Sequence, residues 1–186
     1  MKKFVLLVLF SAFFVLPNFV WADTIVLGTI SSDTTWSPAG GIYIVNDGFS
    51  VTASTTLTIL PGTIVKVKSF GGGLPTIYGK IFAHGTSDHP IYFTSFWDDT
   101  IGGDTDGMPD SSANRWPGLY FKFGSEGDFD FVDISDAGTG GYWGSGNYIS
   151  IENDGGNLDI KHSNIHDNRM TVSDGGSGSM VIGSGI

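Results

Sequence analysis

Residues 57–67 read LTILPGTIVKV and carry the clearest structural pattern in this chain. Apolar and polar side chains alternate on both sides of the Pro61-Gly62 pair, as in strands that bury one face. Proline fixes φ and the following glycine accepts a positive φ, so this pair favours a tight turn. The stretch therefore predicts two consecutive strands, with Lys66 between apolar neighbours in the second.

The pattern continues outward as β-branched and aromatic runs separated by Gly, Asn, Asp and Pro, without a sustained helical period. These runs are residues 42–45, 49–51, 57–60, 63–67, 76–83, 91–94, 119–123, 129–134, 148–151, 158–161, 170–172 and 180–182. They fit either an antiparallel sandwich or barrel, or a solenoid whose coils contribute two or three strands each. Two-residue hairpin turns are scarce and the turns are unequal, which favours the solenoid.

Further segments carry a family resemblance. IYGKIFAHGT at 77–86 and PIYFTS at 90–95 follow the first stretch, and DDTIGGDTDG at 98–107 precedes WPGLYF at 116–121. Together they resemble bacterial secreted right-handed parallel β-helix repeat proteins of the pectate-lyase-like superfamily. The resemblance implies an all-β, right-handed parallel β-helix with an acidic insertion near 98–117. It implies no single activity, because that superfamily includes lyases, hydrolases, adhesins and surface proteins.

Four residues of these segments have expected structural roles. Gly79 and Gly85 are expected where corners are tight or neighbouring coils pack closely, because a side chain would not fit there. Trp116 and Phe121 are expected to fill the core beside the insertion.

Residues 1–22 have the layout of a secretory signal: two lysines, an apolar run over 4–16 and a small residue at Ala22. The apolar run is too short to span the roughly 30 Å of bilayer hydrocarbon. We therefore expect signal cleavage, no membrane span in the mature chain, and secretion or cell-surface display, with the periplasm as an alternative.

Composition excludes several classes of function. The 186 residues carry a formal net charge of −10 and no cysteine. The acid excess argues against nucleic-acid binding, because few cations are available to replace phosphate counterions. The absence of cysteine excludes disulfides, thiolate zinc sites and cysteine nucleophiles.

The acidic insertion is the candidate metal site. It contains five aspartates on a glycine-rich segment, and these are Asp98, Asp99, Asp104, Asp106 and Asp110. Hard oxygen ligands of this kind suit Ca²⁺. An EF-hand is rejected, because position 12 counted from Asp104 is Arg115, which is no ligand. The alternative is a solvated acidic loop without metal.

An enzyme is the second interpretation. A β-helix polysaccharide lyase needs a basic residue beside carboxylate-bound calcium, and the basic side chains expected in range are Lys80, Arg115, Lys122 and Arg169. A glycoside hydrolase needs two carboxylates at a defined gap. Asp98 and Asp99 are adjacent, so on a strand they point to opposite faces. A third interpretation, a β-sandwich carbohydrate-binding module, requires antiparallel pairing.

Two smaller features remain. His162 and His166 have a spacing that suggests zinc on a helix, but here the segment is expected to be strand and corner, with exposed histidines. Tyr142 and Trp143 lie in a glycine-rich segment and could present a flat apolar surface to a sugar ring.

The sequence thus predicts a β-helix domain over residues 23–186, with 23–45 as a possible N-terminal cap. The C-terminal strand has no evident cap, so the chain is expected to be the N-terminal part of a longer protein. The favoured function is a secreted or cell-surface scaffold, adhesin-like, that binds calcium and polysaccharide or cell-surface glycans. The alternative is a carbohydrate-active enzyme, a polysaccharide lyase or glycoside hydrolase, whose active site is incomplete in this chain.

Overall fold

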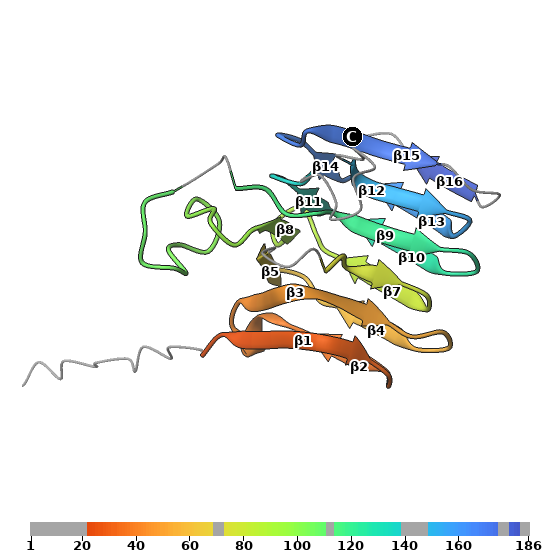
Figure 1. Ribbon diagram of the computed structural model, residues 1–186, viewed down its shortest axis with the longest axis horizontal. Helices are drawn as coiled ribbons and strands as arrows, with labels where there is room; N and C mark the ends of the chain where they lie inside the picture. Colours follow the sequence, from red (N-terminus) through yellow and green to blue (C-terminus); the bar gives the residue numbers. More distant parts are fainter. Residues whose placement is uncertain (1–21, 69–72, 111–113, 139–148, 175–178, 183–186) are drawn as a thin grey trace, which may run out of the picture.

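The computed structural model describes residues 22–68, 73–110, 114–138, 149–174 and 179–182. Figure 1 shows a stack of strands that rises from the N-terminal end of the described chain to its C-terminal end. The described residues contain no α-helix, and their one helical element is a 3-10 turn, η1 (Pro38–Gly40). The expectation of an all-β protein is confirmed.

Short strands make up most of the described chain. They are β1 (Thr24–Ile30), β2 (Thr34–Trp36), β3 (Tyr43–Val51), β4 (Thr56–Ile59), β5 (Ile64–Lys68), β6 (Thr76–Ile77), β7 (Lys80–His84), β8 (Ile91–Ser95), β9 (Leu119–Lys122), β10 (Glu126–Asp130), β11 (Val132–Ile134), β12 (Ile149–Asp154), β13 (Asn157–Lys161), β14 (Asn164–Ile165), β15 (Met170–Asp174) and β16 (Ser179–Ile182). Three strands, β1, β2 and β14, lie outside the predicted runs.

The pairings between these strands are all parallel. From β4 to β13, each strand pairs with the strand three places further along the chain, as in the series β4, β7, β10, β13 and β16. The long strand β3 pairs with β5 through its first half and with β6 through its last two residues. A ten-stranded and a six-stranded sheet result, in a nearly closed, barrel-like arrangement compatible with a parallel β-helix. The alternative interpretations that need antiparallel pairing, a sandwich or barrel and a β-sandwich binding module, are therefore wrong.

Inward-facing side chains form rows that cross the stacked strands. One row in the six-stranded sheet consists of Ile59, Ala83, Phe129 and Ile160, which are at most 1% exposed. Burial of each large apolar side chain contributes roughly 1.5–3 kcal/mol relative to leaving it in water. The hydrophobic core is therefore continuous along the stack.

The corners between strands follow the predicted turn chemistry. Gly62, between β4 and β5, has a φ of 78°, which the preceding proline cannot adopt and glycine can. A Cβ on Gly79 would lie 2.2 Å from the backbone oxygen of Thr52, and one on Gly85 would lie 2.4 Å from that of Phe131. Neighbouring turns of the chain thus approach each other too closely for any side chain at these two positions.

Aromatic side chains fill the core beside the predicted insertion. Trp116 and Phe121 are fully buried, as expected. The indole N–H of Trp116 donates a 2.7 Å hydrogen bond to the backbone oxygen of Ser135, so its one polar atom is satisfied. Near the N-terminal end, Trp36 is 4% exposed and stacks on Tyr43 with ring centroids 4.8 Å apart.

Candidate functional site

The predicted insertion leaves the stack between β8 and β9 and lies to one side of it (Figure 1). We call residues 96–110 the acidic loop. Its base covers the outer surface of the ten-stranded sheet, where Gly102 lies against the side chains of Ile42 and Ile64. The loop is therefore packed onto the sheet at Gly102.

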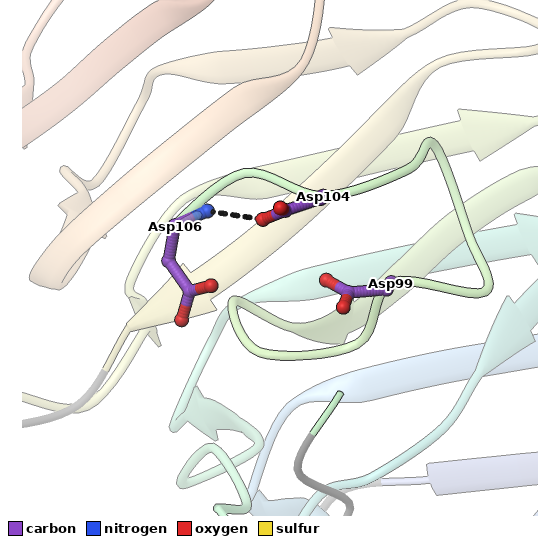
Figure 2. A group of neighbouring side chains, drawn as sticks. All are labelled: Asp99, Asp104 and Asp106. Carbon is purple, nitrogen blue, oxygen red and sulfur yellow. Dashed lines mark hydrogen bonds between the residues drawn. The ribbon is translucent and has the colours of Figure 1, made fainter. Parts of the chain in front are cut away.

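Three of the five predicted aspartates come together in this loop. Asp99, Asp104 and Asp106 each offer a carboxylate oxygen, and these oxygens all lie within 4.8 Å of one another. Figure 2 shows Asp99 facing the other two across the loop. We call these residues the aspartate triad. The spacing allows one cation to contact all three carboxylates.

Local hydrogen bonds shape one side of the triad. A carboxylate oxygen of Asp104, Oδ1, accepts the backbone N–H of Asp106 at 3.0 Å and that of Gly107 at 2.6 Å. These N–H groups lower the pKa of Asp104 below its ordinary value. Asp104 is therefore charged at neutral pH and held in a turn that its own side chain stabilises.

Asp99, on the other side of the triad, has a carboxylate oxygen without a hydrogen-bond partner in the described residues. Burial, followed by the charges of Asp104, Asp106 and Asp110, raises the pKa of Asp99 above its ordinary value. The Oδ1 atom of Asp99 is buried and has no hydrogen-bond partner in the described part of the chain. A bound cation would relieve both the mutual repulsion and the unpaired oxygen.

Asp98 and Asp110 lie outside the triad. Asp98 is only 6% exposed, and its carboxylate accepts hydrogen bonds from the Thr94 hydroxyl and from the backbone N–H and hydroxyl of Thr100. Burial raises the pKa of Asp98, but these hydrogen bonds outweigh that effect and lower it overall. Asp110 is exposed and acts on Asp99 through its charge.

A basic residue that hydrogen-bonds to the acidic loop is one that sequence reasoning missed. Lys66, on β5, is fully buried, and its Nζ donates to the backbone oxygens of Asp98 at 2.7 Å and Gly103 at 2.6 Å. A longer contact of 3.4 Å reaches Thr105 Oγ1. Burial lowers the pKa of Lys66, and the negative charge of Asp98 offsets this in part.

The expectation that the basic partners come from Lys80, Arg115, Lys122 and Arg169 is therefore wrong in omitting Lys66. Lys80 pairs with Glu126, and Lys122 pairs with Asp154. Arg115 donates to the backbone oxygens of Ala137 and Asp167. Lys66 alternates with buried valines on its strand, a pattern that normally places a lysine in solvent, so its burial was not predictable from the neighbouring residues.

The two histidines lie at an exposed corner, as expected. His162 contacts Asp130 at 2.7 Å, and His166 contacts Asp133 at 3.0 Å and Asp167 at 2.7 Å. Both side chains are exposed by about half, at 52% and 41%. Within the described ranges, the aspartate triad is the one group of three or more metal-ligating side chains close enough to share an ion.

Tyr142 and Trp143, the predicted sugar-contacting pair, lie outside the described residues. No helix in the described part of the chain is long and apolar enough to cross a membrane.

Comparison with known proteins gives no match to a protein-family model, to a curated protein or to a solved structure.

Proposed function

We propose that this protein is a secreted or cell-surface scaffold built on a right-handed parallel β-helix. The pairing of each strand with the third strand after it supports the fold, since a three-strand coil repeated along an axis produces that pairing. The signal-like residues 1–22 support the location. Intact-mass measurement of the exported protein tests the location: a mature chain that begins at Asp23 is expected.

The scaffold carries a Ca²⁺ site at the aspartate triad. One observation carries this proposal: three carboxylates separated by up to seven positions in sequence converge within 4.8 Å. Ca²⁺ takes six to eight oxygen ligands and tolerates irregular geometry, so water would complete a site of this kind. The affinity is expected to be in the range of extracellular calcium modules, a Kd of about 10⁻⁴–10⁻³ M.

The environment of Lys66 favours a binding role over a lyase activity. A base that removes a proton from a polysaccharide must reach the substrate. Lys66 is fully buried and its Nζ is already donating to backbone oxygens of the loop. The cation beside the acids is thus occupied in holding the loop, which is a structural task.

Glycans are the proposed partners of this scaffold. The support comes from the sequence of residues 138–146, where Tyr142 and Trp143 are flanked by glycines. Aromatic rings on such a segment can stack on the apolar face of a sugar. Binding to a polysaccharide panel that is lost in Trp143→Ala, with retained thermal stability, would support this partner class, and unchanged binding would contradict it.

Calorimetric titration with Ca²⁺ tests the metal site directly. Asp104→Asn and Asp106→Asn each remove a charge while keeping a side-chain oxygen for the local turn. Each is expected to weaken Ca²⁺ binding by tenfold or more, about 1.4 kcal/mol. Asp110→Asn is the matched control, since it removes a nearby charge outside the triad, and a much smaller loss is expected. Absence of binding at millimolar Ca²⁺ by the unaltered protein would refute the site.

A further inference from the structure

The acidic loop covers two polar, outward-facing side chains that would otherwise be in water. Parallel pairing places Ile44, Lys66 and Thr94 side by side on β3, β5 and β8. Their neighbours Val65 and Val67 point into the core and are fully buried. Yet Lys66 and Thr94 are themselves 0% exposed, because the loop lies over them. Two polar donors of the sheet therefore point into the underside of the loop.

Each donor fastens a different part of the loop. The hydroxyl of Thr94 donates to Asp98 Oδ2 at 2.7 Å and fixes the start of the loop. Lys66 Nζ reaches further, to the backbone oxygens of Asp98 and Gly103. These two oxygens belong to peptide groups five residues apart, so one ammonium group closes the loop on itself.

The acceptors of Lys66 have a particular relation to the aspartate triad. Asp98 directly precedes Asp99, and Gly103 directly precedes Asp104. Thr105, the third and longer contact, lies between Asp104 and Asp106. Each aspartate of the triad is thus next in sequence to a residue that has an oxygen atom in contact with Lys66 Nζ.

We propose that Lys66 is the positioning residue that assembles the aspartate triad, so that the three carboxylates are gathered before any metal ion arrives. An ammonium group has three donors and a positive charge, which lets it draw together several loop oxygens as a bound cation would. Its charge also offsets part of the repulsion within the triad, as its effects on Asp99 and Asp104 indicate. The use of the assembled triad for Ca²⁺ rests on the proposed function, whereas the assembly itself does not.

Amide hydrogen exchange in the presence of a chelator tests the assembly without metal. The informative amides are those of Asp106 and Gly107, which donate to Asp104 while the loop is formed. Lys66→Met keeps the length of the side chain and removes its donors. We expect exchange of these amides to accelerate by about tenfold or more, while amides of the core strands remain protected. Lys80→Met, an exposed lysine in the six-stranded sheet, is the control and is expected to leave the loop amides unchanged.

Two further measurements keep the outcomes distinct. If Lys66→Met does not fold, Lys66→Gln replaces it, because its amide keeps a donor at this buried position but is shorter and carries no charge, and exchange of the loop amides is expected to rise several-fold. Ca²⁺ titration of Lys66→Met is expected to show at least tenfold weaker binding than the unaltered protein. Loop amides that stay as protected in Lys66→Met as in the unaltered protein would overturn the positioning role. A loosened loop in a protein that never bound Ca²⁺ would support the positioning role and refute the metal site.

Discussion

Lys66 and Lys80 make an instructive comparison, because both occupy outward-facing positions, Lys66 on β5 of the ten-stranded sheet and Lys80 on β7 of the six-stranded sheet. Lys80 begins β7, and its side chain is 49% exposed and pairs with Glu126 at 2.5 Å. Lys66, in the middle of β5, has no exposed surface and bonds to backbone oxygens of the acidic loop. The strands are alike in pattern, and the difference lies in what covers their outer face.

The comparison teaches how one insertion changes the chemistry of a regular surface. On the six-stranded sheet the charged outer side chains are 35–56% exposed, and they pair with residues of the adjacent strand or of their own strand. Over the ten-stranded sheet the loop excludes water from Lys66 and Thr94. Where water is excluded, losing a hydrogen bond costs more stability, because the polar group left behind cannot bond to solvent instead.

The largest expected effect on stability comes from replacing the two lysines themselves. Lys66→Met should lower the free energy of unfolding by about 2 kcal/mol, because it leaves buried loop oxygens without a donor. Lys80→Met should lower it by less than about 1 kcal/mol, as for other exposed ion pairs. Urea unfolding of both variants at neutral pH measures the difference, and equal losses would show that burial of Lys66 is energetically unimportant.

An intermediate effect on stability is expected at Asp98, the loop residue that accepts a hydrogen bond from Thr94. Because its pKa is lowered in the folded protein, its stabilising contribution is present above the ordinary aspartate pKa, near 3.9, and is lost as pH falls through the lower folded value. Asp98→Asn should therefore cost about 1–2 kcal/mol at pH 7 and progressively less in acid.

The measurement for Asp98 is the difference in unfolding free energy between the unaltered protein and Asp98→Asn from pH 7 down to the acid limit of folding. The corresponding substitution at exposed Asp110 is the control and should show little difference at any pH. A difference for Asp98 that stays constant below pH 4 would contradict a role for its charge.

The smallest expected effect belongs to His166, on the uncovered part of the same sheet. Burial alone would lower its pKa, but the hydrogen bond to Asp167 and the charge and hydrogen bond of Asp133 raise it above its ordinary value. A raised folded pKa stabilises the protein below the unfolded value, near 6.5, and this contribution disappears as pH rises through the folded value.

Thermal unfolding of His166→Gln across pH 5 to 9 checks this expectation. The variant should melt about 1–2 °C below the unaltered protein at pH 5 and at nearly the same temperature at pH 9. His84→Gln is a useful companion, because His84 pairs with a single carboxylate, Asp128, on the other sheet. A deficit for His166→Gln that grows with pH would be inconsistent with the two-carboxylate environment.

Much of the architecture follows from local sequence alone. Alternation along residues 57–67 and the Pro61-Gly62 turn predicted two strands that the structure contains as β4 and β5. Short strands with unequal turns favoured a parallel stack over hairpins, and the pairings are parallel. These features are readable because side-chain alternation and turn chemistry depend on neighbours within a few positions.

The site was predictable only in part. The sequence placed five aspartates in one loop but could not say which would meet, since Asp98 turns inward to Thr94 whereas Asp99 joins Asp104 and Asp106. Lys66 and the loop are separated by more than 30 positions, and no local pattern links them. The order of residues 98–110 determined that acids would gather on this loop. The folding of the loop back over β5 decided their arrangement, because burial and hydrogen bonding depend on what lies adjacent in space.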